Sequence, residues 1–228
     1  MSLLSPRPRP QRVTLSGHYV QLQPLSFESH FESLLAACTA PGAAERFRYL
    51  FDEPPTAESL ATWFQAVTPL NDPLFFAVVD VGTGRCEGRQ ALMRVTPEHG
   101  VIELGSIFWG ASMARTRMAT EALYLSAAYV FDELGYRRFE WKCDADNEPS
   151  RRAALRFGFT FEGVFKQHMI VKGRNRDTAW FAMLDHEWEH IKRGYQRWLS
   201  ADNFGPDGRQ LERLQSQLGL AAGAEGAG

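Results

Sequence analysis

The fold is decided by the stretch Asn147-Glu148-Pro149-Ser150-Arg151-Arg152-Ala153-Ala154-Leu155-Arg156-Phe157-Gly158-Phe159. Asn147 is a favourable N-cap, Pro149 suits the first turn of a helix, and Gly158 suits the position after its last turn. These signals predict a helix over residues 147–157. Capping alone explains this helix, but it does not explain the order of the elements on either side.

On the N-terminal side, residues 137–144 alternate between apolar and charged side chains, which predicts a strand with one face in water. The helix before it is predicted over 117–134, where an apolar stripe at helical spacing ends at Gly135. Further upstream, apolar and alternating runs predict an antiparallel meander. The meander strands cover 74–81, 86–95 and 101–109, after a strand over 18–22 and helices over 27–38 and 56–67.

On the C-terminal side, strands are predicted over 161–171 and 178–184, joined by a polar hairpin tip, Lys172–Asp177. A meander followed by helix, strand, helix and hairpin predicts a mixed α/β (α+β) fold. This order argues against a doubly wound Rossmann sheet, and the absence of the G-x-G-x-x-G pattern agrees.

Three local features accompany this order: the N-x-x-S motif at Asn147 with its short basic helix, Gly158-Phe159, and Glu162-Gly163. Together they resemble the GCN5-related N-acetyltransferase (GNAT) superfamily, and within it the ribosomal-protein N-terminal acetyltransferase (RimJ/RimL-like) branch. The resemblance implies a three-layer fold whose splayed, mostly antiparallel sheet of six or seven strands is flanked by helices. It also implies an acetyl-CoA-dependent N-acetyltransferase that acts on a primary amine by direct attack in a ternary complex, without a metal.

In this family a Q/R-x-x-G-x-G/A loop before the long helix holds the coenzyme A pyrophosphate through backbone N–H groups and the helix dipole. The present chain lacks both glycines. The pattern can be aligned in two registers. In the first, Ala114 takes the Q/R position, and Arg117 and Ala119 replace the two glycines. In the second, Arg115 takes the Q/R position, and Met118 and Thr120 replace the two glycines. The resemblance implies a cofactor site made of Ile107, Phe108, Trp109, Ala114, Arg115, Thr116, Arg117, Met118, Ala119, Thr120, Asn147 and Arg152.

Two residues are candidates for proton transfer. A base must take a proton from the amine, and Glu103, on the strand that resembles the family's E-I-G-Y-x-L strand, is the candidate. Ser150 is the candidate donor to the departing sulfur. Ser106 stands in place of the family's aromatic residue, and Ala154 stands where many members have a tyrosine acid.

Other interpretations stay open. The missing glycines also suit a non-catalytic acyl-CoA-binding module. His186 and His190 match the H-E-x-x-H pattern of zinc hydrolases, although a polar, solvated surface helix explains them more simply. The basic cluster Lys172, Arg174 and Arg176 suits an acidic substrate, the adenosine phosphate, or a solvated hairpin tip.

Cysteine 143 is read as a packed strand cysteine rather than a nucleophile, because no nearby residue would activate it. The acceptor amine stays open among a protein N-terminus, a polyamine, an aminoglycoside and an amino-acid analogue. A homodimer also stays open.

Composition limits the partners. The 228 residues contain 25 Lys and Arg against 27 Asp and Glu, so no basic field attracts nucleic acid or a membrane. No run of about 18 apolar residues occurs, and residues 1–13 lack the apolar region of a signal peptide. Three dispersed cysteines are too few for a disulfide framework, which predicts reduced thiols in a cytoplasmic protein. The expected organisation is a flexible lead-in (1–16), the N-acetyltransferase domain (17–185), a helical extension (186–218) and a disordered tail (219–228).

Overall fold

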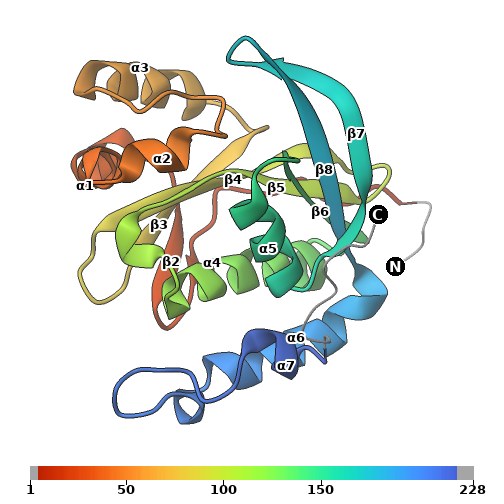
Figure 1. Cartoon of the computed structure of the whole chain (residues 1–228). Coiled ribbons are helices and arrows are strands. Elements are labelled where there is room, and N and C mark those ends of the chain that lie inside the picture. The colour runs from red at the N-terminus through yellow and green to blue at the C-terminus, as the bar shows by residue number, and fades with distance from the viewer. Residues whose placement is uncertain (1–4, 220–228) are drawn as a thin grey trace.

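The structure is a computed structural model that describes residues 5–219 (Figure 1). A mixed sheet of eight strands forms its centre, in the spatial order β1-β2-β3-β4-β5-β6-β8-β7. Within residues 5–219, β5 and β6 are the only neighbouring strands that run parallel. The strands are β1 (Leu15–Ser16), β2 (Val20–Pro24), β3 (Leu74–Asp80), β4 (Cys86–Thr96), β5 (Val101–Trp109), β6 (Arg138–Asp144), β7 (Thr160–Val171) and β8 (Arg174–Leu184).

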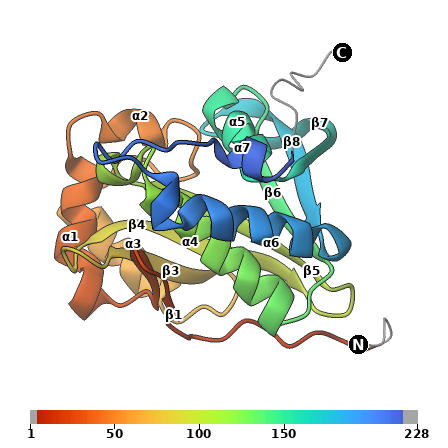
Figure 2. The same ribbon diagram turned by 90° about the horizontal axis from the view of Figure 1, so that it is seen from below.

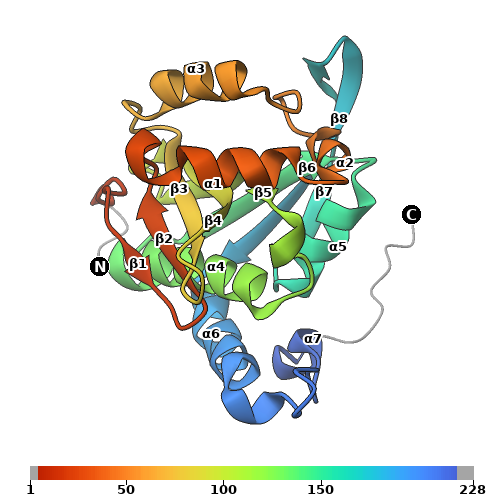
Figure 3. The same cartoon turned by 90° about the vertical axis from the view of Figure 1, so that its left-hand side faces the viewer.

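Helices cover both faces of the sheet, so the fold has three layers (Figure 2 and Figure 3). The first group, on one face, is α1 (Phe27–Thr39), α2 (Ala43–Phe47) and α3 (Ala57–Val67). The opposite face carries α4 (Arg117–Ala128), which a π-helical turn extends to Glu133, and α6 (Asp185–Leu199) with the short α7 (Leu214–Gln217). Helix α5 (Glu148–Arg156) lies next to the ends of β5 and β6. The expected fold class is confirmed, with eight strands instead of six or seven.

Two apolar clusters hold the layers together. Because side chains alternate along a strand, β3 contributes to both clusters. Phe76 and Val78 belong to the cluster shared with α4 and α6, whereas Phe75 and Ala77 belong to the cluster shared with α1 and α3. The middle of the sheet is therefore buried on both faces, which makes it a rigid support for the strand ends.

Strands β5 and β6 pair over three residues only, from Val101 opposite Arg138 to Glu103 opposite Glu140. Beyond this point β6 stays paired with β8 as far as Asp144, and β5 stays paired with β4 as far as Trp109. Each strand thus follows its outer neighbour, and the two diverge as the resemblance implies.

A buried carboxylate fixes α4 against the first hairpin. The two carboxylate oxygens of Glu121 accept hydrogen bonds from the backbone N–H groups of His18, Tyr19 and Val20 at 2.6–2.8 Å. A Cβ atom on Gly17 would lie 2.4 Å from Oε2 of this carboxylate, so a larger residue at position 17 would displace the carboxylate from its hydrogen bonds. Glu121 therefore ties the start of the chain to the helix that follows β5.

The expectation of a hairpin tip over Lys172–Asp177 is wrong in its bounds. The turn consists of Lys172 and Gly173, and β8 already begins at Arg174 because residues 174–176 pair with β7. As a result Arg176 is buried rather than solvated at a tip.

Helix α6 is not the solvated surface helix that its polar sequence predicts. Trp188, Ile191, Tyr195 and Trp198 form a buried face that belongs to the same core as α4. Spacing explains the error, because these residues recur at helical intervals among charges that face water.

The proposed domain boundaries are not sharp in the structure. Leu15 and Ser16, placed in the lead-in, form β1, and the extension beyond residue 185 shares the main core. Most of the tail expected over 219–228 lies outside the described residues, as do residues 1–4. Within residues 5–219, no helix has the length and apolarity needed to cross a membrane.

We expect Glu121→Ala to lower the free energy of unfolding by about 3 kcal/mol or more, because buried N–H groups lose a charged acceptor. Chemical denaturation measures this change. Glu133→Ala, an exposed residue at the end of the same helical segment, is the control and should change stability by less than about 0.5 kcal/mol. Equal effects of the two substitutions would contradict the role of Glu121.

Candidate active site

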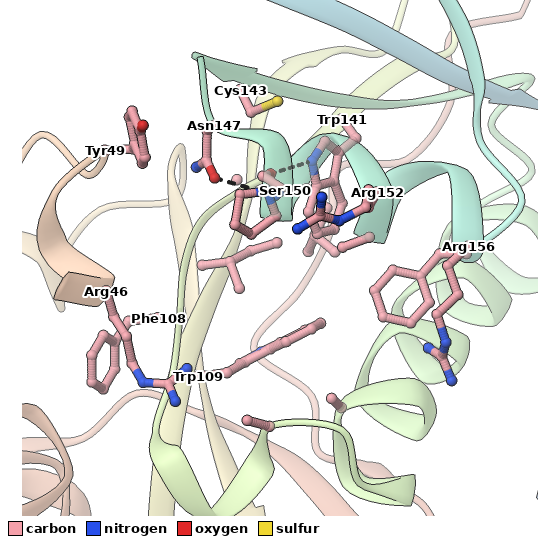
Figure 4. A pocket seen from close by; sticks show the side chains of 18 of the residues that line it. Arg46, Tyr49, Phe108, Trp109, Trp141, Cys143, Asn147, Ser150, Arg152 and Arg156 are labelled. Atoms are coloured by element: carbon pink, nitrogen blue, oxygen red, sulfur yellow. Dashed lines mark hydrogen bonds between the residues drawn. The ribbon is translucent and has the colours of Figure 1, made fainter. Parts of the chain in front are cut away.

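A cavity of about 1810 Å³ fills the gap between the diverging strands (Figure 4). This volume exceeds the range of about 300–1,000 Å³ usual for small-molecule pockets, so it has room for a long ligand and a second molecule. In Figure 4, Arg46 and Tyr49 lie at one end of the view, Arg156 lies at the other, and Ser150 lies between them.

The cavity brings together nearly all the residues expected from the sequence. Thr120 is the exception, because its side chain is fully buried and its Oγ1 accepts hydrogen bonds from Arg156 at 3.1 and 3.2 Å. The expected residues that line the cavity are Glu103, Ile107, Phe108, Trp109, Ala114, Arg115, Thr116, Arg117, Met118, Ala119, Asn147, Ser150 and Arg152.

A bulge in β5 forms the middle of the cavity wall. Ser106 has φ 49°, in the left-handed region, and the register with β4 shifts at this point. The buried guanidinium of Arg89 donates to the Ser106 carbonyl at 3.1 Å and forms an ion pair with Asp52. It also lies 4.4 Å from the ring centre of Trp63. These contacts hold the strained residue in one conformation.

Helix α4 begins at the cavity with its first N–H groups uncapped. Thr116 is the N-cap residue, but its hydroxyl donates to the Met113 carbonyl and does not cap the helix. The free N–H groups and the helix dipole suit an anion. Arg115 has φ 61°, the only left-handed residue of the segment, and this position matches the glycines of neither register.

The C-terminal extension forms one side of the cavity, which the sequence did not predict. Trp198, Phe204 and Gln210 line it next to the start of α4. The guanidinium of Arg117 lies 3.7 Å from the ring centre of Phe204 and donates to the Tyr19 hydroxyl at 2.9 Å. Arg117 is therefore held by aromatic side chains.

Arg156 also lines the cavity, and the sequence analysis did not identify it as a site residue. Burial lowers the pKa of its guanidinium, which lies over the rings of Phe157 and Trp198. No carboxylate within residues 5–219 forms an ion pair with it. Since Arg152 lies four residues earlier on the same face of α5, this helical spacing is the signal that could have identified Arg156.

Ser150 faces the cavity from the first turn of α5. The Asn147 side chain accepts from the Ser150 backbone N–H at 3.2 Å, which confirms the predicted cap. The Ser150 hydroxyl accepts from the Trp141 indole at 3.0 Å (Figure 4) and also lies within hydrogen-bonding reach of the Cys143 thiol. Burial raises the pKa of the neighbouring Cys143 thiol, which keeps it protonated, in keeping with a packed cysteine.

Glu103 lies in a buried ion network rather than on a wet face. Its side chain is 3% exposed, and its oxygens lie 2.6 Å from Arg94 and 2.9 Å from Lys142. Lys142 also contacts Glu140 at 2.7 Å and lies 3.8 Å from the ring centre of Trp180. The alternation predicted for residues 137–144 is present, but the charged face lies against the sheet neighbours and the cavity.

His168 lines the same cavity, and its ring centre lies 5.9 Å from that of Trp180. Its Nδ1 lies 3.0 Å from the Thr178 hydroxyl, which orients the ring. No contact of the other ring nitrogen, Nε2, is formed within residues 5–219. The isolated histidine in a strand carried no signal in the sequence.

The two histidines of the H-E-x-x-H match lie on α6, outside the cavity lining. The Nε2 atom of His190 contacts the Leu218 carbonyl at 3.0 Å, and His186 is exposed next to Asp185. Over residues 5–219, no three His, Cys, Asp or Glu side chains are grouped as ligands for a metal.

Comparisons with known proteins bear on this site. A family model described as an acetyltransferase (GNAT) domain matches residues 20–160. A GCN5-related N-acetyltransferase from Brucella melitensis is 52% identical, with a TM-score of 0.93 over 95% of this chain and 98% of that one.

RimL, a ribosomal L7/L12 α-N-protein acetyltransferase solved in complex with coenzyme A, has a TM-score of 0.64 at 20% identity, over 76% of this chain and 99% of that one. The "Uncharacterized N-acetyltransferase YoaA" of Bacillus subtilis is 34% identical over 70 residues, which is 31% of this chain and 40% of that protein. The matches to the curated relatives span less than two thirds of their lengths, 35%, 40% and 63%.

We expect His186→Ala to change the free energy of unfolding by no more than about 0.5 kcal/mol, the usual range for an exposed residue. His190→Ala removes a hydrogen bond and should cost about 1 kcal/mol. Denaturant titration and metal analysis of the purified protein test both. One zinc ion per chain that is lost in either variant would favour the zinc-hydrolase interpretation.

Proposed function

The chain belongs to the acetyltransferase (GNAT) domain family, and on that premise we propose that it is an acetyl-CoA-dependent N-acetyltransferase that acts on a primary amine. The observation that supports this proposal most is the cavity between β5 and β6, which passes from the uncapped start of α4 to the ion network around Glu103. The likeness to RimL is consistent with the RimJ/RimL-like branch. A cytoplasmic location is part of the same proposal.

The end of the cavity near α4 has the chemistry that a pyrophosphate needs. Backbone N–H groups at Arg117, Met118 and Ala119 are free of a side-chain cap. Arg156 is a half-buried cation that forms no ion pair with an acid within residues 5–219, and Arg115 adds an exposed positive charge. We propose that these groups hold the phosphates of acetyl-CoA, which supplies the acetyl thioester.

The middle and far parts of the cavity suit the transfer step. The bulge at Ser106 turns the main chain of β5 toward the cavity, where a backbone N–H can stabilise negative charge on a carbonyl oxygen. Ser150 lines the cavity with a hydroxyl that can donate its hydrogen, and it is the proposed donor to the leaving sulfur. Together these groups support direct attack by the amine in a ternary complex.

Glu103 is the proposed base for the amine proton. Its Oε1 accepts a hydrogen bond from Arg94 at 2.6 Å. Its Oε2 lies 2.9 Å from the Lys142 Nζ but is buried without a hydrogen bond within residues 5–219, so lone pairs remain there for that proton. His168 lines the same cavity with its Nε2 uncommitted, so it is the competing candidate. If Glu103 is the base, Glu103→Gln should abolish turnover; if His168 is the base, His168→Gln should do so.

The first test concerns coenzyme A. We expect Arg156→Gln to weaken binding of coenzyme A roughly 10- to 100-fold, because a charge-assisted hydrogen bond to phosphate is lost. Titration calorimetry measures the affinity. Arg193→Gln, an exposed arginine on α6 outside the cavity, is the control and should bind as the unaltered protein does. Unchanged affinity of the Arg156 variant would move the phosphates away from this end of the cavity.

The second test concerns the base, with turnover followed by thiol release over a panel of amines. Glu103→Gln should lower turnover roughly 10²–10⁴-fold, and the loss should shrink at high pH, where the amine is already neutral. Glu140→Gln is the matched control, because Glu140 belongs to the same ion network but does not line the cavity. Ser150→Ala should cause a smaller loss and leave coenzyme A affinity intact.

Full activity of the Glu103 variant together with inactivity of His168→Gln would transfer the role of base to His168. Tight binding of coenzyme A without thiol release from any amine would instead favour the non-catalytic acyl-CoA-binding module.

A further inference from the structure

Arg176 is a buried cation without a counter-ion. Its side chain is 7% exposed, and its Nε atom is fully buried without a hydrogen-bond partner within residues 5–219. Burial lowers the pKa of the guanidinium, because the charged form loses water. Removing a charge from water without pairing it is unfavourable, so such a group calls for a ligand or a structural reason.

The position of Arg176 follows from the sheet. Asp144, the last residue of β6, pairs with Thr178, so Arg176 lies on β8 beyond the end of β6 and opposite Met169 of β7. There it lines the same cavity as Glu103. Its terminal nitrogens have no hydrogen bond within the described chain and are not among the fully buried atoms, so they face the cavity.

The surroundings of Arg176 do not neutralise it. The guanidinium carbon lies 5.2 Å from the ring centre of Phe51, which shields one side. Asp144 is the nearest acidic influence, but it forms no ion pair with Arg176, and its Oδ1 accepts from the backbone N–H of Asp146. Glu103 is already paired with Arg94 and Lys142. The positive charge of Arg176 is therefore available to a molecule in the cavity.

The two opposite charges in this part of the cavity suit an acceptor molecule that contains both an amine and a carboxylate. Glu103 offers a carboxylate where the amine is expected, and Arg176 offers two terminal N–H donors farther along the same face of the sheet. A guanidinium is the side chain best suited to grip a carboxylate through two parallel hydrogen bonds.

We propose that Arg176 binds a carboxylate of the acceptor. The preferred acceptor then carries its reacting amine and a carboxylate on the same amino-acid residue. This inference rests on the proposed acetyl transfer. The carboxylate can belong to a free amino acid or to the acidic side chain of a peptide's first residue, and the chemistry at Arg176 is the same in both cases.

The kinetic experiment compares matched acids and amides by thiol release. Glycine is compared with glycinamide, and peptides that begin with Asp or Glu are compared with those that begin with Asn or Gln. We expect kcat/KM to favour the acid of at least one pair roughly 10- to 100-fold, and Arg176→Gln to abolish this preference. The pair that shows the preference identifies the source of the carboxylate.

Two variants keep this result interpretable. Arg176→Lys retains the charge and should retain part of the preference. Arg174→Gln removes an exposed arginine two residues away on the same strand and should leave the preference unchanged. Equal kcat/KM for acids and amides in the unaltered protein would overturn the inference while leaving acetyl transfer intact.

A binding experiment tests Arg176 without turnover. With coenzyme A present, N-acetylglycine and an N-acetylaspartyl peptide are compared with their amides by thermal shift. At least one acid should stabilise the unaltered protein more than its amide does, and Arg176→Gln should remove the difference. If no acid stabilises more than its amide, the inference fails even if the enzyme is active.

A structural role predicts a different outcome. Because Arg176 has no hydrogen bond or ion pair within the described chain, Arg176→Gln should leave the melting temperature of the free protein unchanged or raised. A marked drop in that temperature, with the preference for acids retained by the folded fraction, would assign Arg176 to the fold and overturn the inference.

Discussion

The parallel pairing of β5 with β6 ends after three residue pairs, and the rest of the molecule depends on where it ends. Beyond Glu103 each strand remains hydrogen-bonded to its outer neighbour, β4 or β8, so the two strands cannot also bond to each other. The space between them becomes a cavity lined by both. Helix α4 starts at this cavity and α5 packs along it, which brings two helix starts and two strand ends to one place.

Such an opening in a sheet would be unstable if its polar groups were left without partners. Most of them have partners. Arg89 binds the carbonyl of the strained Ser106, and Glu103 is paired with Lys142 across the gap. Arg156 and Arg176 differ, because no carboxylate of residues 5–219 forms an ion pair with either. The groups with partners support the walls, and Arg156 and Arg176 are the two shielded cations of the wall for which we propose ligands.

Much of the framework could be read from local signals. The bounds of β5, the Asn147 cap of α5 and Gly135 after the π-helical turn all follow from short-range rules that operate within a few residues. The same signals, in order, carried the resemblance to the GNAT family that the comparisons confirm. Local rules were sufficient here because capping and strand alternation are decided by neighbours in the sequence.

The sequence by itself therefore determined the order of the elements, the family and one part of the cavity wall, from the end of β5 to the start of α4 and the first turn of α5. Only the tertiary structure decided which charged side chains are buried. Alternation assigns Glu103, Lys142 and Arg176 to a side of the sheet, but it does not reveal what covers that side. Phe51, from a distant segment, covers Arg176, and the aromatic face of α6 covers α4. Burial depends on contacts between residues far apart in the chain, which no local pattern contains.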